Sequence, residues 1–334
     1  DDAVRWDVLR SIRTVFTVHN IEYQGRYGRE TLEDLFGLPS GWYDGGTLAF
    51  SGDVNLLKGA LLTCDAVTAV SPTYAQELKY SYFAHGMEGV MNMCDWKLHG
   101  VLNGIDMKRY DPSCDRQIVE NYTPEDLSGK AACKEALQKE LGLKVDPNIP
   151  IVAVISRLVS HKGLDLICEA LDGMMDIGIQ FVVLGKGDWQ YEEFFSNAQY
   201  RFPGMLAARI EYNEATSMRI YSGADLFLMP SKSEPCGLSQ MIAMRYGTLP
   251  IVRETGGLKD TVHPYEEWCC GGNGFTFANY NAGDMWYVVR EAAQLFWNNK
   301  KAFRTLQERA MTEDFSWKHS AAEYHRIYEQ IHNG

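Results

Sequence analysis

The sequence lacks any apolar run long enough to cross a membrane, and it lacks an excess of positive charge. No stretch approaches the roughly 18 consecutive apolar residues that mark a membrane-spanning helix. The formal net charge at pH 7 is −12, which argues against broad, non-specific binding to nucleic acid. We therefore expect neither a membrane nor a nucleic acid as a partner, while a local basic pocket for an anion stays compatible with this charge.

The motifs of metal sites and of nucleophilic catalysis are absent as well. The 8 cysteines have irregular spacings and form no C-x-x-C pair, so reduced thiols are favoured over a disulfide framework. The sequence contains no H-E-x-x-H, no Walker loop and no G-x-S-x-G. We expect no metal site. The first residue is Asp rather than Met, and no targeting peptide follows it.

The second half has a regular alternation of short apolar strands and helices. Such continuous apolar strands indicate an α/β fold with a parallel sheet covered on both faces. The 334 residues are enough for about two domains. The expected strands are residues 150–155, 180–184, 209–212, 225–229, 248–252 and 274–277, and the expected helices are 163–175, 190–200, 214–222 and 238–246.

The first half is less regular. Its expected strands are residues 13–18, 66–70 and 99–102, with a helix over 54–63 and a long loop over 21–50. About three strands are fewer than a doubly wound domain needs, so we infer that on the order of a hundred residues are missing upstream.

The domain boundary is expected in the polar stretch 142–150, which contains two prolines. This gives domains at 1–146 and 147–314. An amphipathic helix expected over 316–332 forms a third segment, 315–334, that crosses back to the first domain.

The most informative stretch is residues 231–240, which follows the strand 225–229 and begins a helix. Open α/β sheets bind ligands at the carboxyl ends of their strands, and free N–H groups at a helix start attract phosphate. Glu234 is therefore a candidate for holding sugar hydroxyls, with the amides near Gly237 and Leu238 facing a diphosphate. A solvent-facing carboxylate or an N-cap partner is the alternative. Cys236 is interpreted as a small packed thiol, since no His lies nearby in the sequence to activate it as a nucleophile.

Arg157 and Lys162 lie in the turn between the strand 150–155 and the helix 163–175. Two cations beside a helix N-terminus suit a diphosphate, because their charges add to the fixed amide dipoles. An ordinary solvated loop with salt bridges is the alternative. The neighbouring strand end that carries Glu234 favours the anion-binding interpretation.

A second glycine-rich turn consists of Thr255, Gly256 and Gly257. Its amides are candidates for contacting sugar or phosphate, and a plain tight turn explains the two glycines equally well. Tyr212, expected at the end of the strand 209–212, either stacks on a nucleobase or belongs to the core.

In the first half, polar residues again follow apolar strands. His19 is a candidate donor to a sugar near its reacting carbon, and a hydrogen-bonded structural role is the alternative. Its neighbour Asn20 belongs to the same candidate site. Tyr23 and Asn103 either bind sugar hydroxyls or cap their loops.

Taken together, these segments resemble the bacterial glycogen synthases and the related plant starch synthases. The resemblance covers nearly the whole chain. It rests on TVHNI at 17–21 with YQG at 23–25, AVSPTY at 69–74, HGMEG at 85–89, VLNGID at 101–106, SRL at 156–158 with KGL at 162–164, SEPCGL at 233–238, YGTLP at 246–250, TGGL at 255–258 and DFSW at 314–317.

The resemblance implies the GT-B architecture, in which two Rossmann-like domains face each other. It also implies transfer of glucose from ADP-glucose to the non-reducing 4-hydroxyl of an α-1,4-glucan, with retention of configuration. No metal or pyridoxal phosphate is expected, and the expected location is the cytoplasm, or a plastid for a plant protein. The implied catalytic residues are Arg157, Lys162, Glu234 and His19, and the implied nucleotide-sugar site comprises Asn20, Tyr23, Asn103, Tyr212, Cys236, Gly237, Leu238, Ser239, Thr255, Gly256 and Gly257.

The family pattern assigns separate roles to these residues. Arg157 and Lys162 are expected to stabilise the departing diphosphate, and Glu234 to bind glucose hydroxyls. His19 is expected near the primary hydroxyl of the glucose, and Tyr212 against adenine.

One family feature is missing. Members of the family carry a Lys-x-Gly-Gly-Leu loop after their first strand, and none precedes His19 here. This favours an N-terminally truncated chain and leaves a second interpretation open, that of an incomplete chain that binds nucleotide sugar or glucan without turnover. A glycan phosphorylase is a further alternative, and it would need a lysine for pyridoxal phosphate. The residues alone do not distinguish ADP-glucose from UDP-glucose.

Overall fold

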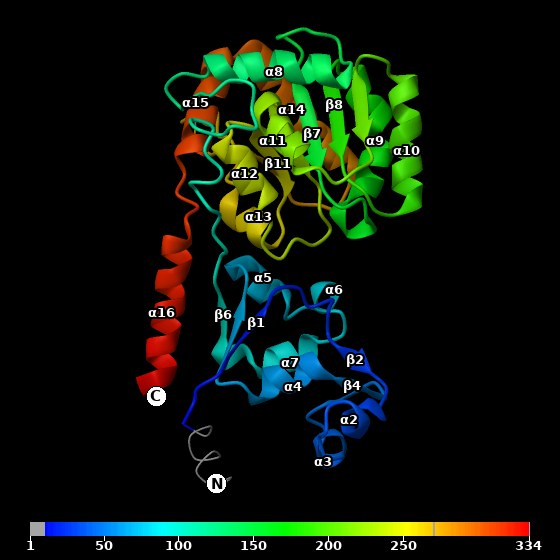
Figure 1. Ribbon diagram of the computed structural model, residues 1–334, viewed down its shortest axis with the longest axis vertical. Helices are drawn as coiled ribbons and strands as arrows, with labels where there is room; N and C mark the ends of the chain where they lie inside the picture. Colours follow the sequence, from blue (N-terminus) through cyan, green and yellow to red (C-terminus); the bar gives the residue numbers. More distant parts are fainter. Residues whose placement is uncertain (1–10, 270, 334) are drawn as a thin grey trace. The chain divides into compact units, whose positions relative to one another are not determined.

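The computed structural model describes residues 11–269 and 271–333, and its contacts divide the chain into two units (Figure 1). The first unit contains the part up to Asn103 together with the part from Lys318 onward, and the second unit is Gly104–Trp317. Each unit contains its own parallel sheet. None of the helices in the described residues combines the length and the apolar character needed to cross a membrane.

The second unit is built on a six-stranded sheet of order β12-β11-β10-β7-β8-β9, in which every pairing is parallel. Its central strands are fully apolar because helices cover both faces. In Figure 1, α11 and α12 lie in front of the strands and α14 lies behind them. The strands are β7 (Ile151–Ile155), β8 (Gln180–Leu184), β9 (Leu206–Arg209), β10 (Leu226–Met229), β11 (Leu249–Arg253) and β12 (Phe275–Phe277).

Helices and strands mostly alternate along the second unit. Asn213 caps α11 by accepting from the Thr216 N–H, and Asn281 caps α14 in the same way through the Asp284 N–H. The helices are α8 (Ser128–Leu141), the 3₁₀ turn Ser160–Lys162, α9 (Leu164–Asp176), α10 (Trp189–Arg201), α11 (Glu214–Gly223), α12 (Ser239–Arg245), α13 (Gly256–Thr261), α14 (Ala282–Asn298) and α15 (Lys300–Thr312).

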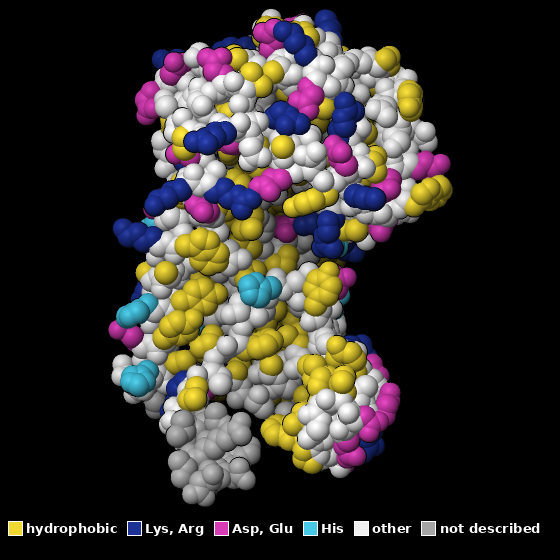
Figure 2. All heavy atoms as spheres, in the orientation of Figure 1, with side chains coloured by type: hydrophobic (Ala, Val, Ile, Leu, Met, Phe, Trp, Pro, Cys, Tyr) yellow, Lys and Arg dark blue, Asp and Glu magenta, His cyan; other side chains and the backbone are white. Residues whose placement is uncertain are grey.

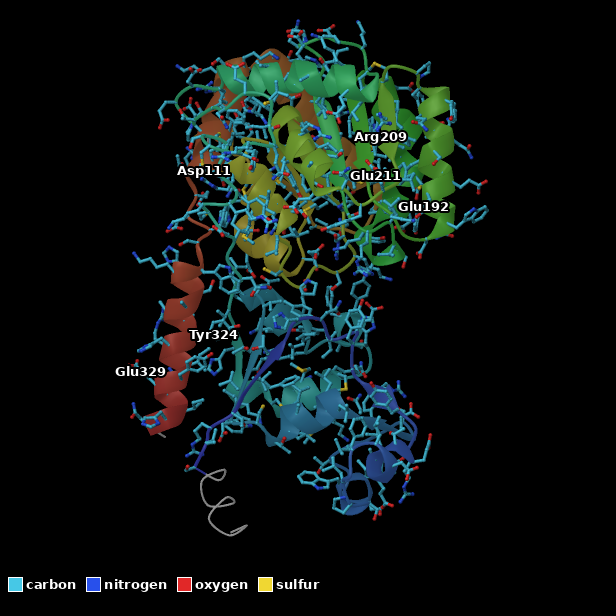
Figure 3. All side chains as sticks on the ribbon, viewed as in Figure 1. Asp111, Glu192, Arg209, Glu211, Tyr324 and Glu329 are labelled. Atoms are coloured by element: carbon cyan, nitrogen blue, oxygen red, sulfur yellow. The ribbon has the colours of Figure 1, made fainter. Side chains whose placement is uncertain are left out.

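The first unit contains a parallel three-stranded sheet, β1-β5-β6, and a small antiparallel sheet, β2-β4-β3. Helix α16 packs its Ile327 against Ala66 and Val101 of this unit. Figure 3 shows Tyr324 on α16, where its ring joins that cluster. The elements are β1 (Val15–Val18), β2 (Arg26–Tyr27), α2 (Thr31–Asp34), α3 (Gly41–Asp44), β3 (Ala49–Phe50), β4 (Asp53–Asn55), α4 (Leu56–Thr63), β5 (Ala66–Ala69), α5 (Pro72–Glu77), α6 (Ser81–Ala84), α7 (Glu88–Met93), the 3₁₀ turn Asp95–Lys97, β6 (Leu98–Gly100) and α16 (Trp317–Asn333).

Three expectations about local structure differ from what the chain forms. The strand expected at 209–212 lies three residues earlier, as β9, because the small apolar residues after Leu206 pair with β8. Residues 21–50 are not one long loop, since they contain β2, α2, α3 and β3. The helix expected over 54–63 begins at Leu56, because the residues before it form β4.

The division between the units also differs from the expected boundary near residue 146. The contacts place it at Gly104, because α8 packs against α11 of the second unit. The buried Lys130 Nζ strengthens this packing by donating to the main-chain oxygens of Ser222 and Tyr246, at 3.0 and 2.8 Å. Residues 104–146 therefore pack with the second unit.

Candidate active site

The carboxyl ends of the parallel strands of the second unit lie along one edge of the sheet. The turns that follow β7, β10 and β11 begin at Ser156, Pro230 and Glu254 respectively. These turns carry the Arg157, Glu234 and Gly256 segments, which are far apart in sequence. The topology therefore places the candidate donor-binding segments of this unit on the side where open α/β sheets bind ligands.

The most direct contact at this edge joins Lys162 to Glu234. The Lys162 Nζ lies 2.6 Å from Glu234 Oε2, and both side chains are largely buried, with 18% and 9% of their surfaces exposed. The Ser231 hydroxyl donates to the same oxygen at 3.1 Å. A carboxylate held by an ammonium and a hydroxyl has a fixed orientation, which is the property that a sugar-binding carboxylate needs.

Glycines let the loops around Glu234 approach one another through their backbones. A Cβ on Gly163 would lie 2.0 Å from the Pro230 oxygen, and a Cβ on Gly256 would lie 2.0 Å from the Glu234 oxygen. Both glycines have positive φ, +73° and +45°, a region that favours glycine. The Gly257 N–H donates to the main-chain oxygen of Glu234 at 3.2 Å. The turn Thr255–Gly257 thus supports the backbone of Glu234 directly.

A cavity of about 250 Å³ opens beside the Lys162–Glu234 pair. Arg157 lies at this cavity and is exposed, and Leu238 is 46% exposed beside it. Cys236 is 5% exposed, which agrees with a packed thiol. The lining consists of Val154, Ile155, Ser156, Arg157, Lys162, Leu228, Met229, Pro230, Ser231, Glu234, Gly237, Leu238 and Ser239.

A second cavity, of about 570 Å³, adjoins the first. The two share Ile155, Ser156, Arg157 and Ser239 in their linings. The second cavity also contains Lys186, which follows β8, and Tyr221, whose phenol has its pKa raised by burial. An ion pair between Arg109 and Glu214 lies in the same lining.

Tyr212 lines this second cavity with 92% of its surface exposed. It lies beyond β9, whose last residue Arg209 is labelled in Figure 3, and directly follows the labelled Glu211 in the sequence. Its alternative interpretation as a core aromatic is wrong. An exposed ring beside a cavity has a free face for a planar ligand.

The candidates of the first unit follow its strands. His19 is exposed after β1, and Tyr23 is 66% exposed. Asn20 Oδ1 accepts from the Glu22 N–H at 2.9 Å, so this side chain stabilises its own turn. Asn103 is half-buried after β6. The contribution of these four residues to sugar binding stays a prediction.

Sequence reasoning missed two residues that hold the Glu234 loop and one that lines the second cavity. Ser231 and Arg253 bond to the loop, and Lys186 lies in the second cavity. A hydroxyl three residues before Glu234 is a weak local signal. The contacts of Arg253 and Lys186 depend on which strands are neighbours, which a local motif does not reveal.

Charge is mixed over the visible surface of the second unit. Figure 2 shows Lys and Arg interspersed with Asp and Glu there. The smaller cavity is different, because its described lining residues include Arg157 and Lys162 against Glu234 as the one acidic member. This local set suits an anionic ligand despite the net charge of −12.

Comparison with known proteins identifies the family of the chain. Residues 3–93 match the family described as starch synthase catalytic domain, and residues 134–301 match glycosyl transferases group 1. The chain is 45% identical to a glycogen synthase of Alkaliphilus metalliredigens over 322 residues, which is 96% of this chain and 68% of that relative. It is 44% identical to a glycogen synthase of Clostridium acetobutylicum, covering 96% of this chain and 67% of the relative.

Solved structures give the same result. The catalytic domain of starch synthase IV from Arabidopsis thaliana, bound to ADP and acarbose, superposes with a TM-score of 0.91 at 36% identity, covering 98% of this chain and 69% of that one. A sucrose-phosphate synthase from Thermosynechococcus elongatus matches with a TM-score of 0.59 at 18% identity, covering 98% and 70%, which shows the fold alone. The expected family and the GT-B fold are thereby confirmed. The chain belongs to the glycogen synthase and starch synthase family of hexosyltransferases.

Proposed function

We propose that this chain transfers glucose from ADP-glucose to the non-reducing 4-hydroxyl of an α-1,4-glucan, with retention of the α configuration. The observation that carries the proposal is the Lys162–Glu234 contact of 2.6 Å in a cavity that also contains Arg157. One carboxylate and two cations in one small cavity match a neutral hexose joined to a diphosphate. The starch synthase IV neighbour was solved with ADP and acarbose bound, which supports the same ligand classes for this chain.

The smaller cavity is proposed to hold the glucose and the diphosphate. Glu234 accepts hydrogen bonds from glucose hydroxyls, since its carboxylate is oriented by Lys162 and Ser231. Arg157 lies at both cavities and so pairs with the diphosphate where the two meet. The amides around Gly237, Leu238 and Gly256 are proposed to support the sugar and the phosphates.

The larger cavity is proposed to hold the nucleoside. Tyr212 stacks its exposed ring on the adenine, which is a stabilisation of about 1–3 kcal/mol in comparable base–aromatic contacts. In the first unit, His19, Asn20, Tyr23 and Asn103 remain candidates for binding sugar. The choice of ADP-glucose over UDP-glucose rests on the family.

The reaction breaks the bond between the anomeric carbon and the diphosphate oxygen, and it forms a bond to the acceptor 4-oxygen on the same face. Negative charge develops on the leaving diphosphate, and fixed cations lower the barrier because they need no reorganisation. We assign this stabilisation to Arg157 and Lys162. The acceptor hydroxyl passes its proton to the departing diphosphate oxygen, so the transfer needs no carboxylate nucleophile. We also propose that the reaction uses neither a metal nor pyridoxal phosphate.

The decisive experiment is Lys162→Ala, assayed for glucan elongation and for ADP-glucose binding by calorimetry. Removing one preorganised donor from a developing charge costs about 100- to 1000-fold in turnover, and we expect a much smaller change in donor affinity. Lys259→Ala is the matched control, because it removes an exposed cation of α13. Near-wild-type turnover in Lys162→Ala would rule out the assigned role.

Two further measurements separate the rival functions. ADP-glucose binding without elongation of a maltooligosaccharide would show a chain that binds the donor but does not turn it over. The absorbance of pyridoxal phosphate in the purified protein would instead indicate a phosphorylase. A trapped covalent glucosyl-enzyme would overturn the same-face mechanism in favour of a carboxylate nucleophile.

A further inference from the structure

Arg253 is a buried arginine at the end of β11, where it points at the Glu234 loop. Only 8% of the surface of Arg253 is exposed. The Arg253 Nη1 donates to the main-chain oxygens of Ser231 and Lys232, at 3.3 and 2.8 Å. One guanidinium group therefore holds two successive carbonyls of the Glu234 loop, separated from Glu234 by Ser233 alone.

These two carbonyl contacts connect Arg253 to both members of the Lys162–Glu234 pair. Ser231 donates its hydroxyl to Glu234 Oε2 at 3.1 Å. The Lys232 N–H donates to the His161 oxygen at 2.9 Å, and His161 directly precedes Lys162. A displacement of the 231–232 backbone would consequently move the hydroxyl that orients Glu234 and the turn that carries Lys162.

The surroundings of Arg253 do not favour the stability of the fold. Its Nε is buried and has no hydrogen-bond partner among residues 11–269 and 271–333, and its guanidinium lies 5.7 Å from the Tyr280 ring centroid. A buried cation with an unpaired N–H contributes less to stability than an apolar side chain of similar volume. The geometry instead suits a group that fixes a loop in one position.

We propose that Arg253 is a positioning residue that holds Glu234 for the glucose of the donor. The inference rests on the proposed function, because it assumes that Glu234 contacts the glucose. Arg253 itself bonds to backbone and acts through the loop. It follows that loss of Arg253 affects the glucose part of the donor selectively and leaves the recognition of ADP intact.

The test compares the affinities of ADP and ADP-glucose, which requires binding but no turnover. In Arg253→Met we expect the affinity for ADP-glucose to fall about tenfold, the size of one hydrogen bond to a charged group, with the affinity for ADP changed less than about twofold. Glu234→Gln should show the same selective loss. Adding Arg253→Met to Glu234→Gln should cause no further loss, since residues that act through one another are not additive.

A matched control and a second variant keep the test decisive. Arg304 also holds a loop through two carbonyls, those of Pro124 and Glu125, so Arg304→Met should leave both affinities unchanged. Arg253→Gln keeps a polar side chain and should reproduce the selective loss if the Met variant does not fold. An equal fall in ADP and ADP-glucose affinity, or a loss that persists on the Glu234→Gln background, overturns the inference. If Glu234→Gln itself leaves ADP-glucose affinity unchanged, the proposed role of Glu234 fails first.

Discussion

Replacing Gly163 by alanine should separate the two loops that carry Lys162 and Glu234. Gly163 has φ of +73°, and an added Cβ would lie 2.0 Å from the Pro230 oxygen. The left-handed backbone costs an alanine about 1–2 kcal/mol, of which about 0.4–1 kcal/mol is recovered from the less flexible unfolded chain. Relieving the clash with a backbone atom costs about 1–3 kcal/mol more. We expect a total loss of about 2–4 kcal/mol in the free energy of unfolding.

Gly142→Ala is the control that isolates the clash. Gly142 has nearly the same φ, +71°, but its added Cβ would meet no atom within 4 Å. This variant should lose only the backbone term, about 1 kcal/mol. Urea denaturation of both variants should show Gly163→Ala to be less stable by about 1–3 kcal/mol.

The same pair tests the link to the site. Because Gly163 lies between Lys162 and the Pro230 backbone, Gly163→Ala should also weaken ADP-glucose binding in calorimetry, whereas Gly142→Ala should bind normally. Equal stability of the two alanine variants would refute the packing argument. Reduced stability with unchanged donor affinity would show that the spacing of these loops does not control the site.

Three more predictions use other features of the second unit. Burial lowers the pKa of Lys130 from its ordinary 10.5 to about 7. Between these values the unfolded chain binds a proton that the folded chain lacks, so the free energy of unfolding should rise with pH by up to about 1.4 kcal/mol per pH unit. Urea titrations from pH 7 to 9 should show a smaller slope in Lys130→Met. An unchanged slope would contradict the lowered pKa of Lys130. Asp225→Asn leaves the buried Lys134 without its partner at 2.7 Å and should cost about 3–5 kcal/mol in unfolding free energy, whereas Asp172→Asn at the exposed Arg201 pair should cost less than about 1 kcal/mol. Tyr212→Ala should weaken ADP binding about 5- to 150-fold through lost stacking. Tyr212→Trp should keep the affinity, because it keeps an aromatic face, and an unchanged affinity in the alanine variant would show that the base does not stack on this ring.

The sheet of the second unit was predictable because its strands are buried on both faces. Such strands are continuous apolar runs, so β8 agrees with its expected bounds, and β7 and β10 differ by one residue. Helix α8 had no expected counterpart. Its buried face includes Lys130, Lys134 and Gln138, which are held by hydrogen bonds rather than by apolar contact, so the apolar period that marks a helix is weak there.

The site was predictable in its parts but not in its contacts. Arg157, Lys162 and Glu234 stand at strand ends, and the rule for open α/β sheets places strand ends together. The 2.6 Å bond between Lys162 and Glu234 joins residues 72 positions apart, and no local pattern specifies it. The contacts of Arg253 could not be predicted from a local pattern either, because its hydrogen bonds to the Glu234 loop depend on β11 lying next to β10.

The Lys162–Glu234 pair implies that the two cations of the smaller cavity, Arg157 and Lys162, have different roles. In the free chain the charge of Lys162 is already matched by a carboxylate at 2.6 Å, so it adds little attraction for an incoming diphosphate. Arg157 is exposed and lies at both cavities, so its field acts on the ligand from the start. In the proposed transfer, the charge on the diphosphate grows as the sugar–phosphate bond breaks, and Lys162 would then face a second anion. Arg157 should therefore contribute to donor affinity as well as to the rate of transfer, and Lys162 mainly to the rate of transfer.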